Sequence, residues 1–328
     1  MKFIIGAYAT APSLGLNNPN IEKEYYLKLI ESVPYIRGLE IPFWGHDIHV
    51  NGTDFLLRFI EPGWYNVLTC IPGTMMALKS NRFFGLASDD ENGRFAALKM
   101  HKRAHQKLLE INQHIGRNVF LAVQIATGPS IPVDGVSSSM KSLKKSLTEI
   151  LSWDWQGSKI VIEHCDSFVR HMPFEKGFMN IHDEIGVLLS FIANHKVGIT
   201  LNWARSAIEG RSTKTVIEHI EITKKSGLLS GMMFSGTSDK NIEYGVWKDT
   251  HMPVAQEGKI WSNSLLTTKQ IEKSMLNIDI NLIDYVGIKF LLMPLTSKCI
   301  NTRVHIIRDA ILTLKKTIQR CQEASYHE

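Results

Sequence analysis

The sequence is poor in cysteine, and this scarcity excludes a disulfide framework or a zinc module as the basis of the fold. Its four cysteines, Cys70, Cys165, Cys299 and Cys321, include no Cys-x-x-Cys pair and no zinc-type spacing. A chain of 328 residues buries enough apolar surface to fold without covalent links. We therefore expect free thiols in a reducing compartment, and we expect Cys165, within an apolar run, to be a buried hydrophobic residue and not a nucleophile.

Long apolar runs and dense basic patches are also missing. No stretch of 18 or more apolar residues occurs, so no membrane-spanning helix is expected. The first residues, MKFIIGAYATA, carry one positive charge and a very short apolar segment, which favours a first strand over a secretory signal. The densest basic group, residues 141–145, has helical spacing typical of a solvated helix face. These features predict a cytoplasmic protein that binds neither nucleic acid nor membrane.

Short apolar segments alternate with amphipathic segments along the whole chain, as expected when strands alternate with helices. The segment KIVIE is almost continuously apolar, which is typical of a strand buried on both faces. The predicted strands cover residues 3–8, 37–43, 65–70, 119–125, 159–163, 198–201, 231–234 and 285–292. The predicted helices cover residues 22–36, 55–60, 89–115, 140–151, 181–194, 213–226, 268–276 and 304–321.

This alternation predicts a (β/α)8 barrel, or TIM barrel, that spans residues 1–328 as a single domain. The alternative is an open, doubly wound sheet. No G-x-G-x-x-G segment follows a predicted strand and no P-loop is present, so the usual nucleotide sites of that alternative are missing. A long insertion, residues 235–264, follows the seventh predicted strand.

In such barrels the reacting groups lie at the C-terminal ends of the strands, so the residues that end each predicted strand are the candidates. Glu163 follows the four residues KIVI, whose apolar members we expect to be buried, and its carboxylate points either into the barrel mouth or into a salt bridge. Lys289 is the single cation within YVGIKFLL, and a buried lysine is rare unless it is paired. Both are candidate catalytic residues, with a structural ion pair as the alternative for each.

The insertion adds a second pair of candidates, Asp249 and His251, which form a D-x-H motif suited to proton transfer or metal binding. His164 follows Glu163 directly, and because strand neighbours alternate we expect His164 to be a packed, neutral residue. Two tryptophans follow strand ends and are predicted either to stack on a sugar ring or to cover the barrel. The candidate binding residues are Glu40, Trp44, Gln124, Asn202, Trp203 and Arg205.

Several segments, taken in order, resemble the xylose-isomerase-like superfamily, which contains sugar isomerases, ketose 3-epimerases and endonuclease IV. They are GLEIPF, the block LASDDENGRFAALKMHKRAHQKLLEINQHIG, KIVIEH, GITLNWAR and D-T-H-M-P…E-G. The resemblance covers nearly the whole chain and implies a (β/α)8 barrel that acts in carbohydrate metabolism. More narrowly, the chain resembles an uncharacterised bacterial branch, a domain of unknown function.

The resemblance also implies a metal site, made from a Glu after strand five, an Asp in D-x-x-H after strand six, a His after strand seven and a Glu after strand eight. Glu163 matches the first position. Asn202 stands in the place of the Asp, Ser235 lies near the place of the His, and Lys289 stands in the place of the last Glu. We therefore expect the usual divalent site to be lost and no cofactor to be needed. If a divalent metal is bound, its candidate ligands are Glu163, Asp249 and His251.

The resulting hypothesis is an isomerase or epimerase of a sugar or sugar derivative, which moves a proton next to a carbonyl. Glu163 would be the base, and Lys289, Arg205 or His251 would stabilise the enediolate oxygen. The alternative is a non-catalytic carbohydrate-binding or regulatory barrel. DNA repair of the endonuclease IV kind is disfavoured, because it needs a metal cluster and a basic groove. The expected partner is a small-molecule sugar or sugar derivative, and a homo-oligomer is left open.

Overall fold

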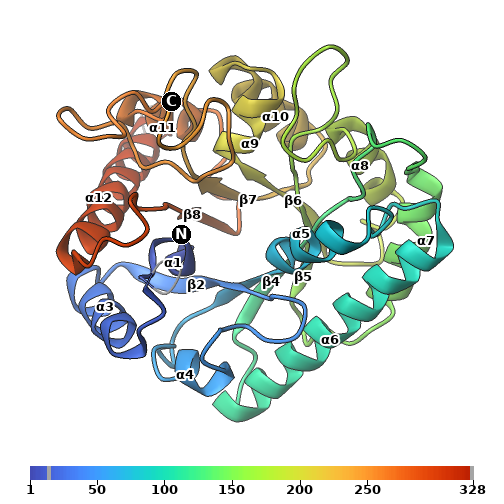
Figure 1. The fold of residues 1–328 in the computed structure, drawn as a ribbon, viewed down its shortest axis with the longest axis horizontal. Coiled ribbons are helices and arrows are strands. Elements are labelled where there is room, and N and C mark those ends of the chain that lie inside the picture. Colours follow the sequence, from blue (N-terminus) through green and yellow to red (C-terminus); the bar gives the residue numbers. More distant parts are fainter. Residues whose placement is uncertain (13–15, 326–328) are drawn as a thin grey trace. The chain divides into compact units, whose positions relative to one another are not determined.

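The computed structural model of the chain describes residues 1–12 and 16–325. Its eight strands are parallel neighbours in chain order and form a closed barrel (Figure 1). This confirms the predicted (β/α)8 fold. The strands are β1 Phe3–Ile5, β2 Ile36–Pro42, β3 Asn66–Thr69, β4 Phe120–Ile125, β5 Lys159–Glu163, β6 Val197–Asn202, β7 Leu229–Phe234 and β8 Tyr285–Ile288.

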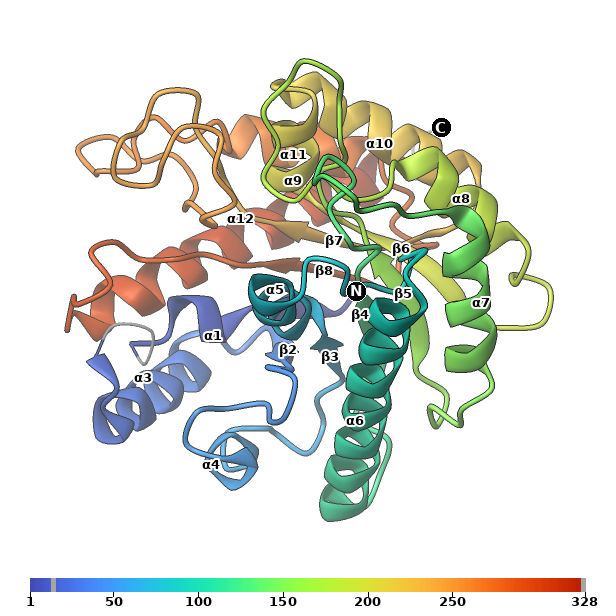
Figure 2. The same ribbon diagram turned by 45° about the vertical axis from the view of Figure 1, so that its right-hand side comes forward.

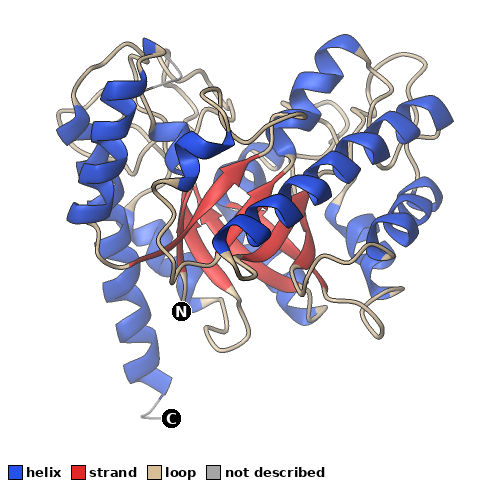
Figure 3. Ribbon diagram, turned by 90° about the horizontal axis from the view of Figure 1, so that it is seen from below, coloured by secondary structure: helices blue, strands red, loops and turns tan. Residues whose placement is uncertain are grey.

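Helices alternate with these strands along the chain. Figure 3 distinguishes the helices, in blue, from the strands, in red. None of the helices that the structure describes is long and apolar enough to cross a membrane. The helices are α1 Ala7–Thr10, α3 Pro19–Ser32, α4 Thr53–Leu57, α5 Ile71–Ser80, α6 Glu91–Ile115, α7 Met140–Leu151, α8 Ile181–Leu189, α9 Trp203–Glu209, α10 Thr213–Lys225, α11 Thr268–Leu276 and α12 Ile300–Ser325.

The chain divides into two compact units, which we call the terminal unit and the middle unit. The terminal unit comprises Met1–Leu39, Leu201–Lys225 and Leu229–Glu328, and the middle unit comprises Glu40–Thr200 and Ser226–Leu228. Within the terminal unit, α12 packs against α3 and α11 (Figure 1). Within the middle unit, α6 packs along α7, and α7 along α8 (Figure 2). That the whole chain is a single domain stays a prediction.

The long helix α6 shows how local sequence sets an element. The side chain of Asp90 accepts a hydrogen bond from the backbone N–H of Gly93, which caps the first turn. Gly116 ends the helix in the left-handed conformation, with φ of 79°. Leu98 and Leu108 lie on the buried face of this helix, whereas the side chain of Phe95 is 52% exposed.

Two predicted strands are too long, and the difference affects the site. The first strand ends at Ile5, and Tyr8 lies in the short helix α1 instead of at a strand end. The hydroxyl of Thr10 in α1 donates to the carbonyl of Phe290 at 2.6 Å. The eighth strand ends at Ile288, before the predicted end at residue 292. This hydrogen bond joins α1 to the segment that follows β8.

None of the four cysteines forms a disulfide, as predicted. Cys165 is buried in an apolar cluster with Ile71, Ala126 and Phe178. Burial raises the pKa of the neighbouring core thiol, Cys70, to about 12, so that thiol stays protonated at neutral pH. The two core cysteines therefore contribute apolar packing.

His101 on α6 provides a test of core stability against acid. It is 1% exposed, its Nδ1 lies 2.8 Å from the carbonyl oxygen of Ala97, and no described residue hydrogen-bonds to its Nε2. Burial lowers the pKa of His101 from 6.5 to about 4. As the pH falls, His101 is therefore protonated in the unfolded chain before it is protonated in the folded protein. Its contribution to the free energy of unfolding is fully present above about pH 6.5 and is lost towards pH 4, and the loss amounts to about 3 kcal/mol.

We expect His101→Gln to remove most of this decline, whatever its effect at neutral pH. Urea unfolding at pH 7.5 and pH 4.5 measures the difference for each protein. The matched control is His114→Gln, which changes an exposed histidine of the same helix and should leave the decline intact. Equal declines in the wild type and in His101→Gln would contradict the expectation.

Candidate functional site

Three predicted residues of the middle unit, Glu40, Gln124 and Glu163, lie on one face of its strands. Gln124 pairs with the residue two positions before Glu163. Glu40 lies two positions before Pro42, which pairs with Thr69, the partner of Gln124. Because residues two apart on a strand point the same way, the three side chains share a face. All three are buried, with at most 1% of their surface exposed.

His164 directly follows Glu163 and lies on the opposite face of the barrel strands. Its Nδ1 lies 2.7 Å from a carboxylate oxygen of Glu184 on α8, and the hydroxyl of Thr127 donates to the other oxygen at 2.6 Å. His164 is thus packed and directed at a helix. Since neighbouring strand residues alternate, Glu163 points away from α8 and towards the barrel interior.

In the terminal unit, Ser235 and Lys289 follow the ends of β7 and β8. Phe234 pairs with Ile288, so the next residue of each chain segment lies on the other face. The side chains of Ser235 and Lys289 are both buried. The Nζ of Lys289 lies 5.1 Å from the ring centroid of Tyr8, which places the cation over an aromatic face.

Asp249 connects two other candidates of the terminal unit. The Nε of Arg205 donates to Oδ2 of Asp249 at 3.0 Å, and Nδ1 of His251 lies 3.2 Å from Oδ1. The side chains are 2% (Arg205), 7% (Asp249) and 17% (His251) exposed. Nδ1 of His251 makes no hydrogen bond of good geometry with a described residue, so the nearby carboxylate acts on the imidazole through its charge and leaves the other nitrogen for chemistry.

Burial is the main reason that His251 favours its neutral form. Burial lowers the pKa of His251, the Asp249 carboxylate opposes that shift, and the positive charges of Lys289 and Arg205 lower the pKa further. The backbone of His251 has φ of 53°, an uncommon conformation for a residue with a side chain. Its carbonyl accepts a hydrogen bond from the N–H of Leu291 at 2.7 Å. The D-x-H motif is therefore an ordered acid–base pair with a buried counter-charge.

Asn202 ends β6 and caps α9. Its Oδ1 accepts a hydrogen bond from the Ser235 hydroxyl at 2.7 Å and from the backbone N–H of Arg205 at 3.5 Å. Trp203 is fully buried, and its Nε1 finds no hydrogen-bond partner among the described residues. Trp44, the other candidate aromatic residue, is half-buried. Helix α9 was not predicted, although Asn202 before the segment WARSAIE is a helix-start signal.

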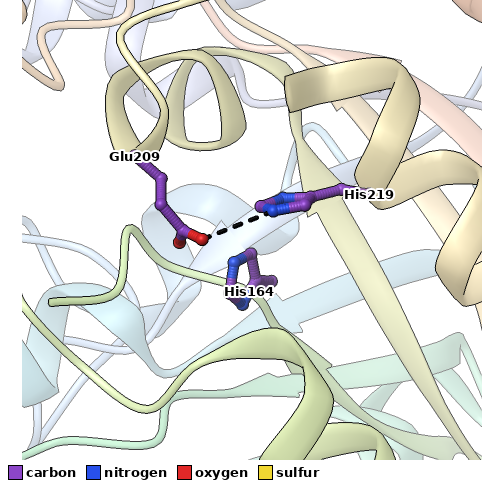
Figure 4. Close-up of side chains that lie close together, drawn as sticks. All are labelled: His164, Glu209 and His219. Atoms are coloured by element: carbon purple, nitrogen blue, oxygen red, sulfur yellow. Dashed lines mark ion pairs between the residues drawn. The ribbon is translucent and has the colours of Figure 1, made fainter. Parts of the chain in front are cut away.

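A further series of polar side-chain contacts in the terminal unit was also not predicted from the sequence. The Nε2 of His219 on α10 lies 3.4 Å from Oε1 of Glu209 on α9 (Figure 4). Its Nδ1 lies 3.1 Å from the Ser206 hydroxyl. Figure 4 also labels His164, which belongs to the middle unit. Ser206 is fully buried, so its hydroxyl serves as a hydrogen-bond partner and not as an exposed nucleophile. The imidazole of His219 and the carboxylate of Glu209 are ligand types that zinc takes.

The terminal unit holds three of the positions at which the resemblance implies metal ligands, and the residues there are poorly suited to a divalent cation. Divalent ions take carboxylates, carbonyl oxygens or imidazoles. Asn202 offers an amide oxygen that already accepts two hydrogen bonds, Ser235 offers a hydroxyl, and Lys289 brings a positive charge. The carboxylate of Asp249 is bonded to the Arg205 guanidinium.

Residues 4–306 match the family described as a domain of unknown function, DUF4862. The chain belongs to this family. It is also 36% identical, over 318 residues, to an uncharacterized protein of Salmonella typhimurium, and the match covers 97% of this chain and 98% of that protein. The predicted relationship to an uncharacterised branch is thus confirmed.

Solved structures show the fold of this DUF4862 protein. A putative xylose isomerase from Rhodospirillum rubrum aligns with a TM-score of 0.60 at 10% identity, over 96% of this chain and 98% of that one. A sugar phosphate isomerase/epimerase from Parabacteroides distasonis aligns with a TM-score of 0.53 at 12% identity, over 95% and 97%. An AP endonuclease, family 2, from Brucella melitensis aligns with a TM-score of 0.51 at 14% identity, over 90% and 95%. The fold is the xylose-isomerase-like barrel.

Proposed function

We propose that this DUF4862 protein is an isomerase or epimerase of a sugar or sugar derivative, which moves a proton next to a carbonyl. The names of the fold relatives from Rhodospirillum rubrum and Parabacteroides distasonis support this reaction class. The observation that carries the proposal is the buried arrangement of Arg205, Asp249 and His251 in the terminal unit, with the field of Lys289 acting on the imidazole. Such a neutral imidazole beside fixed positive charge suits general acid–base catalysis.

Each group has a role in this proposal. Asp249 acts through its charge on His251, which gives and takes the proton on the substrate oxygen. Lys289 supplies positive charge where negative charge develops at the carbonyl. Glu163, buried in the middle unit, stays the predicted base for the carbon-bound proton.

The chemistry is proposed to proceed without the superfamily's divalent metal, because a cation and two uncharged side chains stand at the corresponding positions of the terminal unit. Elemental mass spectrometry of protein purified without chelator should then find no stoichiometric Mn, Mg, Co or Zn. If the wild type contains a metal and Glu209→Gln does not, the metal is bound by the Glu209–His219 pair, and the proposal is unaffected. A metal that remains in that variant and is needed for activity would contradict it.

The reaction itself is tested by proton exchange with solvent. Aldoses and ketoses, free and phosphorylated, are incubated with the protein in D2O containing EDTA. We expect at least one of them to gain carbon-bound deuterium and to form an isomer, and we expect His251→Gln to slow this exchange by about 10²–10⁴-fold. His114→Gln, an exposed histidine, is the matched control. Sugar binding without any exchange would overturn the proposal in favour of the carbohydrate-binding alternative.

A further inference from the structure

The terminal unit carries a surface hollow that is separate from the candidate site. The hollow has a volume of about 170 Å³ and lies between the insertion after β7, the start of α11 and one face of α12. Arg205, Asp249, His251 and Lys289 are not among the described residues that line it. A cavity of about 150 Å³ can hold benzene, so this hollow has room for one six-membered ring.

The inner side of the hollow is apolar. Trp261 of the insertion and Ile306 of α12 line it, and both pack in one cluster with Met252 and Leu292. Ala310, one turn after Ile306 on the same face of α12, is 3% exposed and leaves the space open because its side chain is small. An apolar wall of this kind removes the C–H face of a ring from water.

The open side of the hollow is polar. The carboxylate of Asp309 and the hydroxyl of Thr313 lie one turn apart on α12, and Gln256 and Thr268 line the hollow from the insertion and from α11. The Thr313 hydroxyl donates to the backbone carbonyl of Asp309 at 3.0 Å, so its oxygen faces a ligand as an acceptor. A carboxylate is an acceptor as well. A ligand with several hydroxyl donors therefore matches this side.

The charges at the hollow favour a neutral ligand over an amine. Asp309 is the one ionisable side chain among the described residues that line the hollow. Its Oδ1 lies 3.4 Å from Nη2 of Arg308, and the positive charge of that guanidinium offsets the charge of the carboxylate. An amine would have to compete with Arg308, whereas the hydroxyls of a neutral sugar can donate to the carboxylate beside it.

We propose that this hollow binds the ring of a neutral pyranose and acts as an effector site for His251. Pro253, which lines the hollow, lies two residues after His251. Between them, Met252 exchanges two backbone hydrogen bonds with Gly236, of 2.7 and 2.9 Å, and packs in the same cluster as Trp261. A ring seated against Trp261 therefore acts on the cluster that holds the backbone next to the D-x-H pair. This binding needs no carbonyl, so it is independent of the reaction proposed above.

Methyl pyranosides test the binding, because their rings cannot open and they cannot react next to a carbonyl. The methyl α-pyranosides of glucose, galactose and mannose are titrated against the whole protein, and binding is followed by saturation-transfer NMR. We expect at least one to bind. Asp309→Asn should weaken this binding by about tenfold, since it removes a charge-assisted hydrogen bond.

A second variant and a control make the binding test specific to the hollow. Ala310→Phe places a ring in the hollow and should abolish binding of the pyranoside. Asp239→Asn, which changes an exposed acid of the insertion, is the matched control and should leave the affinity unchanged. Binding that is unaltered in Asp309→Asn would overturn the proposal. So would the absence of binding by all three pyranosides, or the binding of cyclohexylamine in their place.

The effector role is tested at the imidazole of His251. The histidine ring signals of carbon-13-labelled protein are recorded by NMR, and the signal missing in His251→Gln identifies that residue. We expect the bound pyranoside to shift this signal in the wild type and not in Ala310→Phe. Binding that leaves the signal unmoved, or a shift that persists in Ala310→Phe, would overturn the effector site. Deuterium exchange is not used in either test, so the failure of this proposal and that of the proposed function are distinguishable.

Discussion

We expect Asp249→Ala to lower the free energy of unfolding by about 3–5 kcal/mol, because it leaves the Arg205 guanidinium buried without its carboxylate. The two groups are joined by a hydrogen bond of 3.0 Å, and both side chains are less than a tenth exposed. Little bulk solvent reaches such a site to hydrate the cation. Chemical denaturation at neutral pH measures the change.

The control for this prediction is Asp309→Ala, which removes the same residue type from an exposed ion pair with Arg308 at 3.4 Å. That change should cost less than about 1 kcal/mol. The double variant Arg205→Met/Asp249→Leu should recover most of the stability lost in Asp249→Ala, since it removes both buried charges together. A loss in Asp249→Ala no greater than that in Asp309→Ala would show that the buried pair is not what stabilises this loop.

The second large effect is expected in activity. Glu163→Gln should slow deuterium exchange by about 10²–10⁴-fold, because the amide keeps the shape of the side chain but cannot take a proton from carbon. Glu163 is the last residue of β5, and its carboxylate is fully buried and points away from α8. Removal of its negative charge therefore acts on the barrel interior.

Glu184→Gln is the matched control for this prediction, since it changes another fully buried glutamate of the middle unit, bonded to His164 and Thr127. It should lower stability, measured by urea unfolding, and leave the exchange rate close to that of the wild type. If both variants lose exchange to the same degree, Glu163 has no specific role in the reaction.

The barrel could be predicted because its strands are rich in apolar residues and its longer helices are amphipathic. The short elements could not. Helix α1 continues an apolar run from β1, and four residues are too few to show a helical period. Helix α5 begins with Ile-Pro-Gly, which reads as a turn, yet Pro72 occupies the first turn of a helix, where no N–H is needed. Such elements are set by tertiary contacts.

The candidate residues could be predicted in part, from their positions at the ends of strands. The pairing of Arg205 with Asp249 could not, because 44 residues separate them and a loop of irregular structure carries the carboxylate. The link between His219 and Glu209 has the same origin, since it depends on an unpredicted helix. Sequence pattern thus locates individual groups, whereas their partners follow from the conformation of the loops.

The hydrogen bond between the His251 carbonyl and the N–H of Leu291 ties the insertion after β7 to the segment that carries Lys289. Tyr244 reinforces this tie, because its hydroxyl donates to the Leu291 carbonyl at 2.9 Å and accepts from the N–H of Met293 at 3.1 Å. Burial raises the pKa of Tyr244 to about 12, so this hydroxyl keeps its proton across the physiological range. The His251 imidazole and the Lys289 amine should therefore move together. When a ligand binds beneath the insertion, spectroscopic probes at either residue should report the same single relaxation rate.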